Sequence, residues 1–316
     1  FLKLNKNIFD VYAVNIVNFV GDNGENALQH KHVRIYRNNN TIEFHRSVHE
    51  QLRYINKDQD LKIGIIPSLV IYHSGYLNKV VNEKNKNERN KILIEKELEK
   101  SNSGFDLYNL ANELITQGRI EDALNTYVLA FQRKTNLFDD WVPRCTVSII
   151  ECLIALEKFD DAKNVIKDAR PIYSDSPDFI FLEGLVEMYT YNLVEAKKHF
   201  YQVLNENERL TNIIKSPDYS NFHPFMKLGM ICELEKDFHG AIKNYCSALN
   251  YNKFSSESIS RILIILSNSH SIDEIYNFLD NIYSHKLNEQ NRGFLVKCTM
   301  NIGMTELASL LLDGNK

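Results

Sequence analysis

The stretch FDLYNLANELITQGRIEDALNTYVLAF, residues 105–131, contains two helix-forming segments separated by Gly118. Apolar residues recur every three or four positions on both sides of this glycine, which predicts two amphipathic helices joined by a tight turn. Small side chains let two helices approach closely, while large ones fill the space toward a further pair. The residues that define the pattern are Leu107, Leu110, Ala111 and Leu114 in the first helix and Ala123, Tyr127 and Ala130 in the second.

The small residue of the second helix recurs along the chain. It is Ala123 in RIEDALNTYVLAF, Ala162 in KFDDAKNVIKDAR, Ala196 in NLVEAKKHFYQVL and Ala241 in DFHGAIKNYCSAL. The successive steps are 39, 34 and 45 residues, and the segment TNIIKSPDYSNFHP can supply the longest insertion. Two weaker units follow, with Ile275 in place of the alanine and then with Ala308. The repetition predicts about five to six helix pairs over residues 104–316.

These units resemble tetratricopeptide repeats, whose period is 34 residues. The resemblance implies an all-α superhelix in which the first helix of each pair lines a concave groove, and such a groove would bind a peptide or protein segment. An array that only packs against its neighbour or forms a dimer is the alternative. Four aromatic residues could reach a groove, although core packing explains each of them more simply: Tyr108, Phe179, Tyr189 and Phe225.

Residues 1–78 have the patterns of strands instead of helices. VYAVNIVNFV alternates roughly at period two and is rich in β-branched and aromatic residues. GDNGEN predicts a turn after it, and HVRIY and TIEFH on either side of RNNN predict a hairpin. IGIIPSLVIYH is a nearly continuous apolar run, which predicts a buried strand ending at His73. Between them, VHEQLRYI at residues 48–55 is a short candidate helix.

Residues 79–103 change character again. Between residues 79 and 100 there is no Gly or Pro, and Glu and Lys recur at helical spacing beside a few apolar residues. This predicts a connecting helix with a mostly solvated charged face. Such a charge run needs no binding partner to explain it.

Composition excludes several classes of function. The chain has 316 residues, 44% hydrophobic and 25% charged, with a formal net charge of -4. This balance gives no electrostatic reason to expect nucleic acid or an anionic membrane as a partner. No apolar run is long enough to span a bilayer. The five cysteines include no CxxC pair, which favours buried free thiols in a reducing compartment and a cytoplasmic location.

The stretch FHRSVHEQLRY, residues 44–54, places His49 next to Glu50. Histidine is a common metal ligand, and a nearby carboxylate can act as a general base. A lone histidine is more often only hydrogen-bonded. The pair by itself therefore leaves both readings open.

The order of several short motifs adds context to this pair. They are Arg37-Asn38, His49-Glu50, His73-Ser74-Gly75-Tyr76, Arg89-Asn90 and LIEKEL. In this order they resemble the C-terminal part of bacterial family 2 glycosyltransferases fused to tetratricopeptide repeats, over roughly residues 10–135. The resemblance implies an α+β chain: the C-terminal remnant of a GT-A type α/β domain at residues 1–78, followed by the repeats. It also implies a nucleotide-sugar donor and a divalent metal, Mn²⁺ or Mg²⁺.

The resemblance assigns expected roles to five residues. Glu50 falls where the catalytic base would lie, and a base must lie within hydrogen-bond reach of the acceptor's proton. His73 matches a metal-binding histidine near the end of the domain, with His49 as the second candidate for the metal. Tyr76 could line the sugar or the nucleotide. Arg37 could stabilise the diphosphate, although a salt bridge within the hairpin would explain it more simply.

One family feature is missing from residues 1–78. The Asp-x-Asp motif that would bind the metal and the diphosphate does not occur upstream of His49, and Asp58-Gln59-Asp60 comes too late in the order. The chain also begins with Phe instead of Met. We therefore expect a fragment of a longer sugar-transfer enzyme, inactive by itself, whose repeats position a peptide or protein acceptor. The alternative is a non-enzymatic repeat scaffold that binds proteins.

Overall fold

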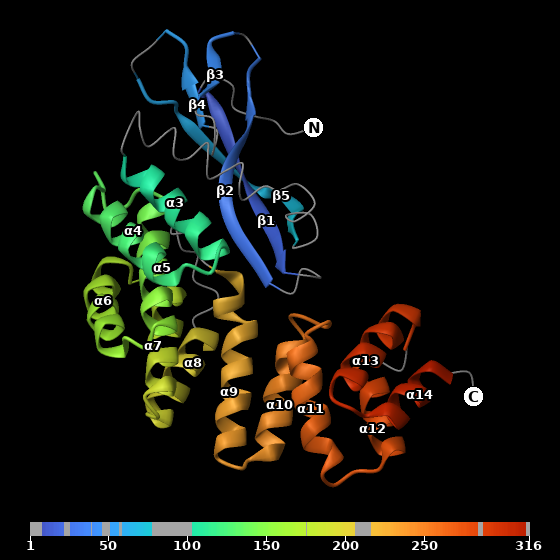
Figure 1. Ribbon diagram of the computed structural model, residues 1–316. Coiled ribbons are helices and arrows are strands. Elements are labelled where there is room, and N and C mark those ends of the chain that lie inside the picture. The colour runs from blue at the N-terminus through green and yellow to red at the C-terminus, as the bar shows by residue number, and fades with distance from the viewer. Residues whose placement is uncertain are drawn as a thin grey trace. The chain divides into compact units, whose positions relative to one another are not determined.

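A computed structural model gives the structure of this chain. It describes residues 8–21, 26–38, 40–45, 51–56, 59–77, 103–174, 176–205, 216–283 and 287–313. The chain divides into two compact units, Phe1–Val186 with Glu208–Pro217 and Glu187–Asn207 with Asp218–Lys316. The first unit contains strands and helices, and the second is helical (Figure 1).

Three strands of the first unit form one sheet. They are β1 (Val11–Gly21), β2 (Asn26–Tyr36) and β5 (Ile63–Leu77), in the order β2-β1-β5. Strand β1 pairs antiparallel with β2 and parallel with β5. The strands predicted at VYAVNIVNFV and at the apolar run are therefore confirmed.

Pro67 interrupts the pairing between β1 and β5. Val14 pairs with Ile66 and Asn15 pairs with Val70, so Pro67 lies in a bulge of β5. Proline has no N–H to donate to a sheet, so a bulge is one of the places where a strand tolerates it. The side chain of Asn15 donates a hydrogen bond of 3.3 Å to the carbonyl of Pro67 across the bulge.

The two faces of this sheet differ in burial. Tyr12, Val14, Ile16 and Ile66 form a buried apolar cluster. On β5 itself, Ile63, Ile65, Val70 and Tyr72 are exposed. The strand predicted at residues 63–73 is thus present, but the prediction that it is buried holds for only part of its side chains.

A second, two-stranded sheet corrects two predictions. Strand β3 (Ile42–His45) pairs antiparallel with β4 (Gln51–Tyr54), whereas β2 pairs with β1, so the predicted hairpin between HVRIY and TIEFH is wrong. The candidate helix at residues 48–55 is also wrong where it is described, because residues 51–54 are a strand. Arg53 lies opposite Glu43, and their side chains form an ion pair of 2.8 Å across the two strands. This cross-strand pair favours the strand over a helix.

The helices follow one another in pairs (Figure 1). A short 3₁₀ helix, η1 (Pro217–Ser220), precedes the fourth pair. The pairs are α3 (Gly104–Thr116) with α4 (Ile120–Gln132), α5 (Trp141–Ala155) with α6 (Phe159–Ile172), α7 (Pro177–Tyr189) with α8 (Leu193–Asn205), α9 (Phe222–Leu234) with α10 (Phe238–Leu249), α11 (Ser256–Ser267) with α12 (Ile272–Ile282), and α13 (Glu289–Asn301) with α14 (Thr305–Asp313). The connecting helix predicted at residues 79–103 lies almost entirely outside the described residues.

The predicted small residues lie in the helix contacts. Ala123, Ala162, Ala196, Ala241 and Ala308 are buried, and so is Ile275, which replaces the alanine in the fifth pair. In the first pair, Tyr127 and Ala130 of α4 are buried together with Leu107, Ala111 and Leu114 of α3, as the sequence pattern predicts.

The turn between the two helices of a pair is itself repeated. A residue with positive φ stands five positions before the small residue in five pairs: Gly118, Glu157, Tyr191, Lys236 and Gly303. In each of these turns the next N–H donates to a carbonyl five residues earlier, as from Arg119 to Leu114 at 3.0 Å. This is the hydrogen bond that closes a helix end of the Schellman type. The repeat is therefore visible in the backbone as well as in the side chains.

Candidate functional site

Only part of the predicted catalytic and metal-binding site lies among the described residues. Glu50 and His49 fall outside the described residues. His73 lies on β5 beside Asn18 of β1, and its Nδ1 atom forms a hydrogen bond of 2.9 Å with the side-chain oxygen of Asn18. Asn18 is buried, whereas His73 is exposed.

Arg37 and His73 lie at opposite ends of the sheet. Arg37 follows the end of β2, where Tyr36 pairs with Val11, while His73 pairs with Asn18. Seven residues of strand separate the two places, or about 23 Å at ~3.3 Å per residue. The backbone of Tyr76 pairs with Val20, near the His73 end. The sheet thus does not bring Arg37 close to His73, and the roles expected of these residues stay predictions.

A metal site would need more donors than the described residues of the sheet supply. Mg²⁺ and Mn²⁺ prefer carboxylate oxygens. The neighbour of His73 is the neutral amide of Asn18. Among the described residues, no group of three or more His, Cys, Asp or Glu side chains is arranged to hold a metal ion. A complete site at His73 would therefore depend on residues outside those described, such as Glu50 or His49.

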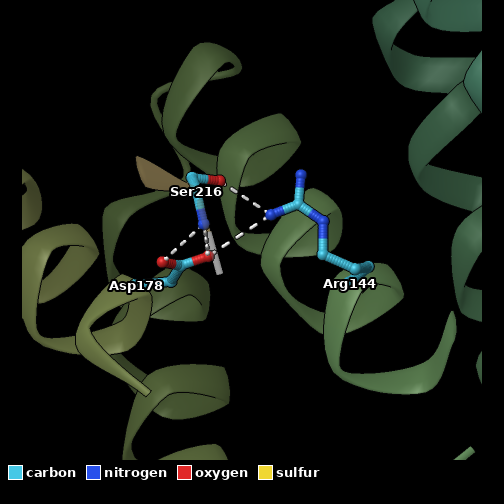
Figure 2. Close-up of polar contacts among 3 residues, drawn as sticks. All are labelled: Arg144, Asp178 and Ser216. Atoms are coloured by element: carbon cyan, nitrogen blue, oxygen red, sulfur yellow. Dashed lines mark hydrogen bonds and ion pairs between the residues drawn. The ribbon is translucent and has the colours of Figure 1, made fainter. Parts of the chain in front are cut away.

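In the first unit, the first helices of the second and third pairs carry a buried polar cluster (Figure 2). Arg144 of α5 forms an ion pair of 3.3 Å with Asp178 of α7 and donates a hydrogen bond of 2.8 Å to the Ser216 hydroxyl. The backbone N–H of Ser216 donates to both oxygens of Asp178 at 3.1 Å. Ser216 belongs to the insertion that the sequence places between Ala196 and Ala241.

This cluster is closed to ligands. Asp178 is fully buried and Ser216 nearly so. Burial raises the pKa of Asp178 to about 6, against the opposing influence of the Arg144 charge and the hydrogen bonds of Ser216. The carboxylate of Asp178 already has its partners from within the chain, so the cluster holds Ser216 in place instead of offering a site. Sequence reasoning did not find it, because Ser216 lies 38 and 72 residues from its partners.

The aromatic residues singled out in the sequence lie mainly in packing contacts. Phe179 is buried and stacks on Tyr173 at 5.4 Å between ring centroids. Tyr108 and Phe225 are half-buried, and each contacts another aromatic ring. Tyr189 alone of the four is exposed. Core packing therefore explains Phe179 fully and the others in part.

In the second unit, the first helices of the last three pairs lie side by side. Arg261 of α11 contacts Glu233 of α9 at 3.4 Å, and the Ser258 hydroxyl of α11 lies 2.9 Å from the sulfur of Met226 in α9. Helices α11 and α13 also pack together. The three helices thus form one continuous surface, which we name the first-helix surface of the second unit. In repeat arrays such surfaces are the binding surfaces.

Two helices of this surface carry a cation and an apolar side chain at equivalent positions. Lys227 of α9 and Arg261 of α11 each stand 14 residues before the buried residue of their second helix, Ala241 or Ile275. Three residues further on, α9 carries Met230 and α11 carries Ile264. Residues three apart lie on one face of a helix. A cation and an apolar side chain therefore recur together on neighbouring helices.

Part of this surface is open to solvent. Ile264 is 50% exposed, and Met300 of α13 is 55% exposed. Lys227 is half-buried, and its hydrogen-bond partner in the structure is the sulfur of Met230 at 3.8 Å. Burial lowers the pKa of Lys227, and the Arg261 charge lowers it further against the attraction of Glu257. Exposed apolar area and a poorly satisfied ammonium thus lie on one surface.

No protein-family model matches the sequence, and no curated protein matches it. Solved structures do. Yeast Tom70 is similar with a TM-score of 0.51 and 13% identity over 73% of this chain and 46% of that chain. The Cut9–Hcn1 hetero-tetramer of the APC/C matches with a TM-score of 0.49 and 14% identity, over 69% of this chain and 40% of that chain. A tetratricopeptide repeat protein from Parabacteroides merdae matches with a TM-score of 0.46 and 12% identity, over 74% of this chain and 87% of that chain.

The chain spans less than half the length of the Tom70 and Cut9–Hcn1 chains that it matches. At 13% identity, the likeness to Tom70 shows the fold alone. The repeated small residues and the repeated turn agree with it, and the helical part of the chain consists of tetratricopeptide-type repeats. None of these comparisons supports the glycosyltransferase part of the sequence interpretation, which stays a prediction.

Proposed function

We propose that the chain is a repeat scaffold that binds a segment of a partner protein on the first-helix surface of the second unit. The observation that carries this proposal is the exposure of Ile264 and Met300 on helices that lie side by side. Large apolar side chains on such a surface gain free energy when a partner covers them. Between the two functions considered for the sequence, this one has the support of the fold.

A selection of peptides from a random display library tests the proposal. The complete 316-residue chain is immobilised, once as wild type and once as Ile264→Asp. We expect the wild type to enrich a family of related peptides. The Ile264→Asp chain should not enrich that family, because a carboxylate there opposes apolar contact. Equal enrichment by both chains would contradict the proposal.

A sugar-transfer function remains a second candidate for the longer protein. The order of short motifs from Arg37-Asn38 through His49-Glu50 to His73-Ser74-Gly75-Tyr76 is what favours it. In this proposal Glu50 is the base, His73 and His49 bind Mn²⁺ or Mg²⁺, Arg37 and Tyr76 contact the nucleotide-sugar, and the repeats position the acceptor. Donor hydrolysis by a chain that includes an upstream Asp-x-Asp motif is the assay. Unchanged transfer after Glu50→Gln, or unchanged metal dependence after His73→Ala, would remove those assignments.

The cysteines support a reducing compartment, and we propose a cytoplasmic location on this ground. All five are free thiols in the structure. Burial raises the pKa of Cys145 and Cys152 to about 12 and that of Cys246 and Cys298 to about 11. Such thiols react slowly, because the thiolate is the reactive form. Separately, no helix among the described residues is long and apolar enough to cross a membrane.

A further inference from the structure

Strand β5 forms one edge of the three-stranded sheet. The order β2-β1-β5 leaves one side of β5 without a pairing strand in the part of the chain that the structure describes. The N–H and C=O groups along such an edge can pair with a further strand. Proteins commonly place charged side chains on an edge strand, because a charge discourages this pairing.

Strand β5 has no such protection. None of its 15 residues is Asp, Glu, Lys or Arg. Four of its apolar and aromatic side chains are exposed, with exposed fractions of 53%, 52%, 38% and 71% for Ile63, Ile65, Val70 and Tyr72. A long apolar edge of this kind is suited to the addition of another strand.

The other described strands with an open edge carry charges. Strand β2 has the exposed cations Lys31 and Arg34, and the two-stranded sheet has the ion pair of Glu43 with Arg53. Strand β1 has no charged side chain, but it is paired on both sides. β5 offers no opposite charge to any of these residues, so the strand that matches it is uncharged. Among the described strands, only β5 itself is both uncharged and open at one edge.

From this match we propose that two copies of the chain associate through β5, edge to edge and antiparallel. Each copy contributes the same edge, so the contact is isologous and closes at a dimer. Pairing of β5 with β2 of another copy would instead form an open chain of subunits, and would place Lys31 and Arg34 beside apolar side chains. The inference is independent of peptide binding by the repeats.

Pro67 sets the register of this pairing. Proline has no N–H to donate, and β5 is bulged at this position, so the segment that can pair regularly is the one beyond it, residues 68–74. An antiparallel pairing that keeps each face of the sheet continuous places the central residue opposite itself. With Ile71 at the centre, Val70 of one copy lies opposite Tyr72 of the other. Such cross-strand pairs of aromatic and β-branched residues stabilise a sheet.

Both faces of the sheet gain contacts in this register. Ile71 packs against the buried apolar cluster of the sheet, so its contact with the second Ile71 joins the clusters of the two copies. On the other face, Tyr72 stacks on Phe19 of β1 with 6.1 Å between ring centroids. This stacking holds the Tyr72 ring in place to receive Val70 of the second copy.

Sedimentation equilibrium of the complete 316-residue chain tests the proposal. The proteins are the wild type, Tyr72→Lys and Ile63→Lys. Both positions are exposed on β5, but Ile63 precedes Pro67 and lies outside the paired segment, so Ile63→Lys is the matched control. We expect a wild-type dimer. Its dissociation constant should rise at least about tenfold in Tyr72→Lys, because a lysine on the edge opposes pairing, and should not change in Ile63→Lys.

Cysteine cross-linking tests the register without the lysine variant. Under mild oxidation, Ile71→Cys should form a disulfide-linked dimer, and Ile63→Cys should not. Opposite Cα atoms of an antiparallel pair are about 4.5–5.5 Å apart, within the range of a disulfide. The five native cysteines should not interfere, because burial raises the pKa of each and their thiols react slowly.

Three results would overturn the proposal. The first is a wild-type chain that stays monomeric at its highest soluble concentration. Protection of the β5 amides from hydrogen exchange in that monomer would then assign the edge to residues of the same chain. The second is assembly beyond the dimer, and the third is a dimer that Tyr72→Lys leaves intact and Ile71→Cys does not cross-link.

Discussion

Three non-glycine residues adopt a backbone conformation that favours glycine. Glu157, Tyr191 and Lys236 have φ values of 57°, 62° and 62° at the turn between two helices. Glycine occupies the same place in two other pairs, at Gly118 and Gly303. A side chain in the left-handed region costs roughly 1–2 kcal/mol. The repeated turn therefore carries local strain in three of its copies.

Lys236→Gly should stabilise the protein. The substitution removes the left-handed strain, and the greater freedom of glycine in the unfolded chain offsets part of the gain. We expect the free energy of unfolding to rise by up to about 1 kcal/mol, measured by urea denaturation. Gly118→Ala is the converse variant, because a Cβ there meets no atom within 4 Å and only the backbone changes. It should lower the free energy of unfolding by about 1 kcal/mol. A less stable Lys236→Gly protein would contradict this account.

Asp178 should make stability depend on pH in a specific direction. Its pKa is about 6 in the folded protein, above its ordinary value of 3.8. The folded state therefore binds the proton more tightly than the unfolded state, and this contribution to stability is present below 3.8 and lost as the pH rises through about 6. Two pKa units correspond to about 3 kcal/mol.

The comparison that isolates this effect is with Asp178→Asn, which cannot titrate. The wild type should lose about 3 kcal/mol relative to the variant between pH values below 3.8 and above about 6, in urea denaturation at each pH. A difference between the two proteins that does not change with pH would show that the pKa of Asp178 is not raised.

At the scale of helices and strands, local patterns explain what the sequence could predict. Ala123 and Tyr127 mark a helix contact because small and large residues must alternate where helices pack. The strand at residues 51–54 was missed, because its alternation is only four residues long. The non-glycine turns at Glu157, Tyr191 and Lys236 carry no sequence signal, since packing on both sides imposes their conformation.

Helices α9 and α10 approach closely at Gly229. A Cβ at this position would lie 2.4 Å from a ring carbon of Tyr245, which is fully buried. Gly229→Ala should therefore destabilise the protein by about 1–3 kcal/mol, through overpacking. Gly293→Ala, in the middle of α13 with no atom within 4 Å, should instead stabilise it by about 0.5–1 kcal/mol, through helix propensity. Thermal or urea unfolding of both variants measures the contrast. Equal effects would show that α9 and α10 are farther apart than described.

At the scale of the whole chain, the repeat fold could be predicted from the sequence, but the polar clusters and candidate sites could be predicted only in part. In the buried polar cluster, Arg144 lies 34 positions from Asp178 and 72 positions from Ser216. No local sequence pattern predicts contacts between residues so far apart. The recurrence of a cation at Lys227 and Arg261 is visible in the sequence, because both hold the same place in their repeats. The expected roles of Glu50 and His49 depend on residues outside those described, so the sugar-transfer hypothesis stays open to the assay of a longer protein.

The most direct test of the scaffold function is the affinity of one selected peptide for three forms of the complete chain. They are the wild type, Ile264→Asp on α11, and Val194→Asp, which changes a similarly exposed apolar residue on the second helix α8. Isothermal titration should give a dissociation constant for Ile264→Asp at least about tenfold above that of the wild type, and an unchanged constant for Val194→Asp. Equal affinity for all three forms, or a loss confined to Val194→Asp, would contradict binding on the first-helix surface.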